Sequence, residues 1–493
     1  MTRRALPALA AAAAVLAACA APPSPLERAA RGPAPSLLEA FGPAAPAVLP
    51  DPAAAQVEEV LAGARLRGRL SLQDCVRAAL AVHEDLVKGD EARLQALLQR
   101  DLALSGVLPE VRMLLRHDRQ DPVTLGTGGG SFSSTEPVRT QWSLNVAQPL
   151  FQGFREFRAM RAAERTAEAL EEDRRNLARG LAGSVARAYY LVVEAEAEAR
   201  ALEESMRLDE ERVREMSARM DQGLARRTEV LLQESRRETT RAALAEVRER
   251  RDAARVTLEA LAGVRTDLPL DPGPDAGGPA PSREDALASA LLLRPDLRAA
   301  ERRAAAAGEE LRVASAQRWP LLSATGNWYL QRWNHSEFSE KTHWDAGLVL
   351  DVPLFLGGEI GARERTAESR IRQAALDGSR VLRAVVEDVD GALVHFRAGH
   401  ERLEALRTNV RFARENLALL QEEYRQGLAT NLEVFTAQIL LQDAAVNLER
   451  QEYQSRLDRI ELLIAMGRDD AVGVPPSAAT PPPPPSPPAK EKP

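Results

Sequence analysis

The side chains that could do chemistry in this chain do not gather into a catalytic pattern. The chain has six histidines, which are His83, His117, His335, His343, His395 and His400. None belongs to a His-Glu-x-x-His zinc motif, and the five-residue spacing of the last two puts them on different faces of a helix. No serine–histidine–aspartate or cysteine–histidine grouping has supporting context. We therefore expect a protein that is not an enzyme, with no cofactor and no bound metal.

Composition points to long helices. Aromatic residues make up 4% of the 493 residues and charged residues 28%, while Ala, Arg, Glu and Leu dominate, as in coiled-coil-like packing. The net charge of −7 comes from interspersed signs, which excludes a basic surface for nucleic acid. Two cysteines cannot make a disulfide framework, and we expect Cys75 to be a small buried hydrophobic residue.

The first 18 residues have the pattern of an export signal. Two arginines precede an apolar stretch from Ala5 to Ala18, which is too short to span a bilayer. The stretch ends in Leu16-Ala17-Ala18-Cys19, which resembles the lipobox of bacterial lipoproteins. That resemblance implies cleavage before Cys19, acylation of this cysteine, and sorting to the outer membrane because residue 20 is Ala. The alternative is an ordinary signal peptide that contains a cysteine.

Two pairs of amphipathic strands interrupt the helical pattern. The expected strands are Val111–Leu115 with Thr140–Gln148, and Leu321–Gln331 with Trp344–Val352, in hairpins 107–148 and 320–353. Their polarity alternates, which fits the apolar-out, polar-in pattern of membrane barrel strands of about 9–11 residues. The alternative is a soluble sheet packed on helices.

All five tryptophans lie in or beside these strands, and we assign three of them to an aromatic girdle at the membrane interface: Trp142, Trp328 and Trp344. Four strands cannot close a barrel, since the smallest membrane barrels have about eight. An open sheet edge in hydrocarbon leaves backbone groups unpaired. If the strands span a membrane, several chains must share one barrel.

The chain contains an internal duplication. Gln222-Gly223-Leu224-Ala225 recurs as Gln426-Gly427-Leu428-Ala429, an offset of 204 (426 − 222), which also relates Gly263 to Gly467. The predicted organisation is a signal peptide (1–18), a Pro/Ala-rich tether (19–70), a first repeat (71–264), a linker (265–282), a second repeat (283–468) and a Pro-rich tail (469–493). Each repeat reads helix, strand, strand, very long helix, turn, helix.

Helix lengths indicate how each repeat is arranged. The proline-free stretch 153–222 is about 105 Å long as a helix, and the stretches 72–105 and 224–262 are about 51 and 58 Å long. Two short helices stacked end to end therefore match one long helix, and 358–426, 283–317 and 428–465 repeat the pattern. A rod of roughly 100 Å with a sheet at one end suggests a protein that crosses a compartment. A helical wall around a lumen and a solid bundle both remain open.

Three features together resemble the TolC-like outer-membrane efflux proteins, over residues 70–468. They are the duplication, the Pro-Leu-Phe-x-Gly phrase that begins at Pro149 and Pro353, and the Gly-Leu-x-x-x-(Thr/Leu)-Glu-Val turn. The lipobox points to the lipoprotein subgroup that serves resistance-nodulation-division pumps. The resemblance implies a mainly α fold, in which a homotrimer shares a 12-stranded transmembrane β-barrel and a long α-helical barrel. A periplasmic adaptor (membrane fusion protein) and an inner-membrane pump would be its partners.

The resemblance also assigns roles at the turns. The tips that dock the adaptor would be Gly223, Leu224, Gly427 and Leu428. The aperture would be formed by Thr228, Glu229 and Glu433, with Arg226 and Arg227 as latching cations. Family members often carry Asp where this chain has Glu. The alternatives are plain hairpin turns without a partner and charges on a solvated face.

Function is expected to be passive conduction of small molecules, drugs or metal ions from periplasm and pump to the outside. The alternative is a periplasmic coiled-coil adaptor or scaffold lipoprotein without a pore, but an adaptor would add a lipoyl-like all-β segment. A hydrolase is disfavoured by the missing site. The sequence does not indicate the cargo.

Overall fold

The structure is a computed structural model, which describes residues 51–119, 138–223, 225–263, 265, 268–273, 279–333 and 340–468. The chain divides into two compact units, Met1–Ala54 and Ala55–Pro493, and the second unit contains both repeats. The signal sequence, Cys19, Leu224 and the Pro-rich tail lie outside the described residues. No helix in the described ranges combines the length and apolarity needed to cross a membrane.

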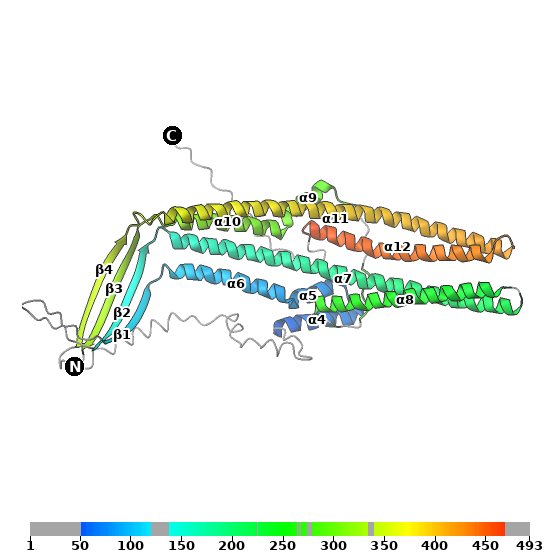
Figure 1. Cartoon of the computed structure of the whole chain (residues 1–493), viewed down its shortest axis with the longest axis horizontal. Helices are drawn as coiled ribbons and strands as arrows, with labels where there is room; N and C mark the ends of the chain where they lie inside the picture. Colours follow the sequence, from blue (N-terminus) through cyan, green and yellow to red (C-terminus); the bar gives the residue numbers. More distant parts are fainter. Residues whose placement is uncertain are drawn as a thin grey trace, which may run out of the picture. The chain divides into compact units, whose positions relative to one another are not determined.

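From α5 onward, the elements follow one another in the same order in both halves of the chain, and α4 has no equivalent among the described elements of the second half (Figure 1). In the first half they are α4 (Asp51–Arg67), α5 (Leu72–Val82), α6 (Glu84–Ser105), β1 (Glu110–Arg119), β2 (Val138–Phe151), α7 (Arg155–Asp221) and α8 (Arg227–Ala262). In the second half they are α9 (Arg283–Leu293), α10 (Pro295–Ala316), β3 (Leu321–Trp333), β4 (Glu340–Asp351), α11 (Glu359–Arg425) and α12 (Asn431–Ala465).

The expected single helices before each hairpin are wrong, because each is broken in two. Residues 72–105 form α5 and α6 with a break at His83, and residues 283–317 form α9 and α10 with a break at Arg294. Both break residues are extended, with ψ of 122° and 125°. Pro295 explains the second break, since a proline disfavours helical backbone at the preceding residue. At the first, the His83 ring accepts the N–H of Asp85 and caps α6.

The duplication is also visible in the backbone angles. Glycines with positive φ occur at matching places at an offset of 204: Gly153 and Gly357, Gly223 and Gly427, Gly263 and Gly467. The first pair ends each hairpin, the second forms the turns at the far end of the helices, and the third follows α8 and α12. Glycine adopts this region without the steric cost that other residues meet.

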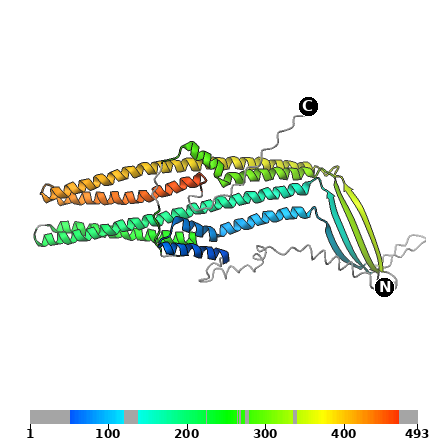
Figure 2. The same ribbon diagram turned by 180° about the vertical axis from the view of Figure 1, so that it is seen from behind.

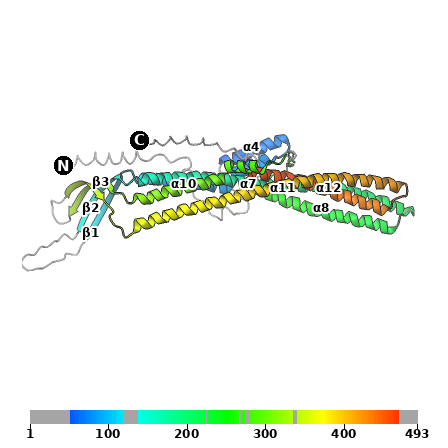
Figure 3. The same cartoon turned by 90° about the horizontal axis from the view of Figure 1, so that it is seen from above.

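Helix α7 is the centre of the helical part. It packs against α5, α6 and α8 from its own repeat and against α10 and α12 from the other repeat. Figure 2 shows the sheet at one end of the long helices and the two helical turns at the other. Figure 3 shows the same elements from above.

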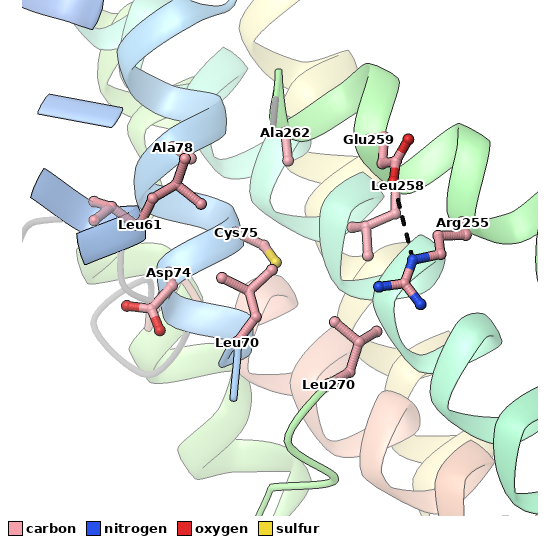
Figure 4. Close-up of a pocket in the computed structure, with 11 residues that line it drawn as sticks. Leu61, Leu70, Asp74, Cys75, Ala78, Arg255, Leu258, Glu259, Ala262 and Leu270 are labelled. Atoms are coloured by element: carbon pink, nitrogen blue, oxygen red, sulfur yellow. Dashed lines mark ion pairs between the residues drawn. The ribbon is translucent and has the colours of Figure 1, made fainter. Parts of the chain in front are cut away.

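The largest core cluster joins α4, α5, α6, α7, α8 and α12 near the middle of α7. Cys75 is buried there, as expected, and burial raises the pKa of its thiol to about 12. Figure 4 shows the pocket around Cys75, with Leu70 and Leu270 on facing segments. The hydroxyl of buried Tyr189 lies 2.9 Å from the Leu70 carbonyl and 2.5 Å from that of Asp271. These contacts join the linker between the repeats to α7.

Candidate functional site

The four strands form one antiparallel sheet in the order β1-β2-β3-β4. The pairing of β2 with β3 joins the two hairpins, so one sheet is built from both halves. The predicted strand Val111–Leu115 is too short, because β1 continues to Arg119 through a polar stretch that pairs with β2. Strands of 10, 14, 13 and 12 residues are long enough to cross the apolar part of a bilayer.

One face of the sheet is apolar and carries the three tryptophans assigned to the girdle. A cross-strand row runs Met113, Leu144, Trp328, Trp344, and Trp142 lies opposite Leu330 in the next row on the same face. The exposed fractions of these tryptophans are 40% for Trp142, 43% for Trp328 and 75% for Trp344. Exposed apolar surface of this kind marks a contact with lipid or with another protein.

The opposite face is polar. A row runs Arg112, Asn145, Asn327, Asp345 across the four strands, and Asn327 donates a hydrogen bond to the Asp345 carboxylate at 2.8 Å. This alternation confirms the two-faced pattern predicted from the sequence. A sheet with one apolar and one polar face suits a wall between hydrocarbon and water.

The Pro-Leu-Phe-x-Gly phrase forms the junction of sheet and helices in the first repeat. Gly153 has φ of +63°, and a Cβ there would lie 2.7 Å from the Ala316 carbonyl oxygen and 2.8 Å from Trp319 Cβ. The Phe151 ring meets that of Trp319 edge-on at 6.4 Å. At this phrase, the backbone at the end of β2 therefore lies close against the turn between α10 and β3.

The turns assigned to adaptor docking are exposed. Gly223 and Gly427 have φ of +73° and +76°, and Leu428 is 76% exposed. Leu224 lies outside the described residues. Tyr424 joins the two turns, since its hydroxyl is 2.6 Å from Arg219 Nη1 on α7. No sequence pattern pointed to this contact, which joins residues 205 apart.

The residues assigned to the aperture lie in the first turns of α8 and α12, and their two glutamates have different surroundings. Glu433 Oε2 accepts the backbone N–H of Thr430 at 2.7 Å and its hydroxyl at 2.8 Å. These bonds hold the pKa of Glu433 below its usual value. Glu229 is half-buried, beside exposed Thr228. Arg226 and Arg227 are exposed, and within the described residues neither forms an ion pair with Glu229 or Glu433.

A buried carboxylate, which sequence reasoning missed, joins three long helices. Glu198 of α7 is 6% exposed. Its Oε2 lies 3.0 Å from Arg250 Nη2 of α8, and its Oε1 lies 2.9 Å from Arg450 Nη2 of α12. The only sequence signal was a glutamate among the alanines Ala195, Ala197 and Ala199 of the long predicted helix.

Comparison with known proteins identifies the class to which this architecture belongs. The model of the outer membrane efflux protein family matches residues 75–264 and 286–468. The outer membrane efflux protein BepC of Brucella suis biovar 1 (strain 1330) is 26% identical over 326 residues, covering 66% of this chain and 71% of that protein. Nodulation protein T of Rhizobium leguminosarum bv. viciae is 29% identical over 177 residues, but the match spans only 36% of its length and 35% of this chain.

A solved structure of CusC superposes with a TM-score of 0.70 at 20% identity, covering 80% of this chain and 92% of that one. At this identity the likeness shows the fold alone, which is the TolC-like fold expected from the sequence. The chain belongs to the outer membrane efflux protein family. The family and the fold are those of channels rather than of enzymes.

Proposed function

We propose that this chain is the outer-membrane exit duct of a tripartite efflux system and conducts small molecules passively. The observation that supports it best is the two-faced sheet, in which β1 and β4 each have one hydrogen-bonded neighbour among the described strands. Each outer edge then carries backbone N–H and C=O groups that need partners in hydrocarbon. Because four strands are too few to close, copies of the same chain supply those partners.

Three copies give a barrel of 12 strands, with the tryptophan face toward lipid and the Asn327–Asp345 face toward water. The same three copies place their helix pairs in a ring, so that the barrel opens into a helical tunnel. Acylation of Cys19 anchors each copy in the outer membrane. Mass spectrometry of the purified chain tests the acylation. An uncleaved or unlipidated N-terminus would contradict the lipid anchor but not the duct.

The exposed turns at Gly223 and Gly427 dock the helical hairpin of a periplasmic adaptor, which links the duct to an inner-membrane pump. The exposed Leu428 side chain supplies an apolar anchor for that contact. Glu229 and Glu433 narrow the tunnel just inside the turns. The arginines at 226 and 227 then pair with a glutamate of a neighbouring copy, and adaptor binding separates these pairs.

The proposal is tested with the full-length chain extracted from the membrane fraction in detergent. We expect three copies by native mass spectrometry and ion conductance after reconstitution in planar bilayers. A monomer that stays in solution without detergent would contradict the duct and favour the scaffold alternative.

The aperture is tested on the same channels with Glu229→Gln combined with Glu433→Gln, for which we expect higher single-channel conductance. Glutamine at 433 keeps a side-chain acceptor for the helix cap, so the change isolates the charge. Glu238→Gln, an exposed change on the same helix as Glu229, is the control. Equal conductance in all three proteins would remove the two glutamates from the aperture.

A further inference from the structure

Helix α11 has an unpartnered side where its repeat partner α7 is covered. Helix α7 packs against helices of both repeats, whereas among the described residues α11 packs mainly against α9, α10 and α12 of its own repeat. Its contact with α7 is at the helix ends, where Tyr424 meets Arg219. The exposed large apolar side chains of α11 are Leu376, Leu382, Val394, Phe412 and Leu419. On the other half of the chain, Leu98 and Leu102 of α6 are exposed in the same way.

We infer that α6 and α8 of a neighbouring copy cover α11, in the register in which α10 and α12 cover α7 within one chain. This inference rests on the proposed ring of copies and names the residues that meet between them. The internal repeat makes it specific. Helices α7 and α11 have 67 residues each and are related by an offset of 204. The same offset relates the first residues of α8 and α12. Helices α6 and α10 have 22 residues each at an offset of 211 (295 − 84).

The first ion pair across α7 and α10 maps onto two residues that keep the same charges, positive on the long helix and negative on the short one. Arg179 lies 3.5 Å from Asp296 within the chain. Adding 204 to the α7 number and subtracting 211 from the α10 number gives the counterparts, which are Arg383 of one copy and Asp85 of the next. Both side chains are exposed, and Asp85 contacts only Lys88 and His83 of its own chain among the described residues.

Two further ion pairs map onto pairs with reversed signs. Glu168 of α7 and Arg302 of α10 are 3.2 Å apart, and their counterparts are Arg372 and Glu91 of the next copy. Here each charge is inverted, yet the pair remains complementary. A joint inversion of this kind keeps the attraction if the two residues face one another.

The second inverted pair extends the contact to the far half of the helices. Glu198 and Arg450 of α12 are 2.9 Å apart, and their counterparts are Arg402 and Glu246 of the next copy. Both counterparts are exposed. The other described ion pairs between α7 and these helices map onto pairs with at least one uncharged residue, so none of the mapped ion pairs becomes a pair of like charges.

The junction at the sheet supports the same register. The counterpart of Gly153 is Gly357, which has φ of +61° and open space where a Cβ would lie. The counterparts of Phe151 and Trp319 are Phe355, which is 84% exposed, and Leu108, which is 53% exposed. In the neighbouring copy Leu108 takes the place of Trp319, and it covers Phe355 as that tryptophan covers Phe151.

The register is tested by cross-linking the full-length protein in detergent with a flexible bismaleimide. The variant Glu91→Cys/Arg372→Cys is expected to give covalent dimers and trimers in denaturing gels. The matched control Glu168→Cys/Arg302→Cys places its cysteines at the equivalent site within one chain, so it cross-links internally and gives no covalent oligomer. Each single-cysteine variant gives no oligomer, and buried Cys75 does not react.

Charge reversal gives a second readout at the same positions. Arg372→Glu or Glu91→Arg alone places like charges in contact and lowers the temperature at which the trimer dissociates, and the double variant restores it. Arg365→Glu, an exposed change on α11 outside the mapped pairs, leaves it unchanged. A trimer that shows neither the cross-link nor the rescue overturns the register alone. If no oligomer forms, the proposed duct falls with it.

Discussion

Glu198 ties α8 and α12 to α7, and its removal has a cost that the structure allows us to state. Glu198→Gln keeps the size of the side chain but leaves Arg250 and Arg450 without their shared carboxylate. Breaking a fully buried ion pair costs about 3–5 kcal/mol. Because the two arginine side chains are 36% and 45% exposed, water compensates part of this, and we expect about 2–3 kcal/mol.

Amide hydrogen exchange followed by mass spectrometry measures this loss locally. A change of about 2–3 kcal/mol corresponds to exchange about 30- to 150-fold faster in the peptides around residues 250 and 450. Glu203→Gln is the matched control, since Glu203 of α7 pairs with Arg248 of α8, with side chains 49% and 51% exposed. The control should cost less than about 1 kcal/mol. If both substitutions accelerate exchange equally, the argument that burial makes the Glu198 ion pairs stronger is wrong.

Two further substitutions test the junction and a buried acid. Gly153→Ala should lower the free energy of unfolding by about 2 kcal/mol or more, because its Cβ meets backbone at 2.7 Å. Gly180→Ala in α7, where a Cβ meets open space, should be neutral or stabilising, and thermal unfolding compares the two. Asp458→Asn should stabilise the protein at neutral pH, because burial raises the pKa of Asp458 above its usual value. Its carboxyl is harder to ionise when folded, so wild-type stability falls as pH rises from about 4 through the raised pKa. Unfolding curves of variant and wild type should therefore converge below about pH 4, and a constant difference at all pH values would contradict the burial effect.

The repeat and the two-faced strands could be predicted from the sequence because local chemistry determines them. Glycines at 153, 223 and 263 recur 204 residues on because the same left-handed backbone positions recur. Side chains alternate between the two faces of a strand, so the positions of the three girdle tryptophans in β2, β3 and β4 put them on the apolar face of each strand, whichever strands are paired. The predicted strand ends at Leu115, where the apolar residues end, whereas the pairing of Arg116 and His117 with Gln141 and Thr140 extends the ladder.

Long-range contacts could not be predicted in the same way. The pairing of Glu198 with Arg450 joins residues 252 positions apart, and nothing in either helix alone indicates it. The break at Arg294 was signalled by Pro295, but the equivalent break at His83 has no proline. There the His83 imidazole accepts the backbone N–H of Asp85, so α5 ends and α6 begins at this residue. Helical periodicity does not indicate this break.

The two glutamates of the proposed aperture are equivalent in the repeat but differ in what holds them. Thr430 begins α12 and gives Glu433 two hydrogen bonds, whereas the residue at the equivalent position before Glu229 is Arg226, which makes no side-chain cap. Glu433 must lose its two hydrogen bonds from Thr430, which cap the N-terminus of α12, before it can pair with another residue. Glu229 has no such bond within the described residues, and the two arginines that precede it, Arg226 and Arg227, are exposed. Any rearrangement of the turns should therefore begin in the first repeat, where the Glu229 carboxylate can take a partner without breaking a helix cap.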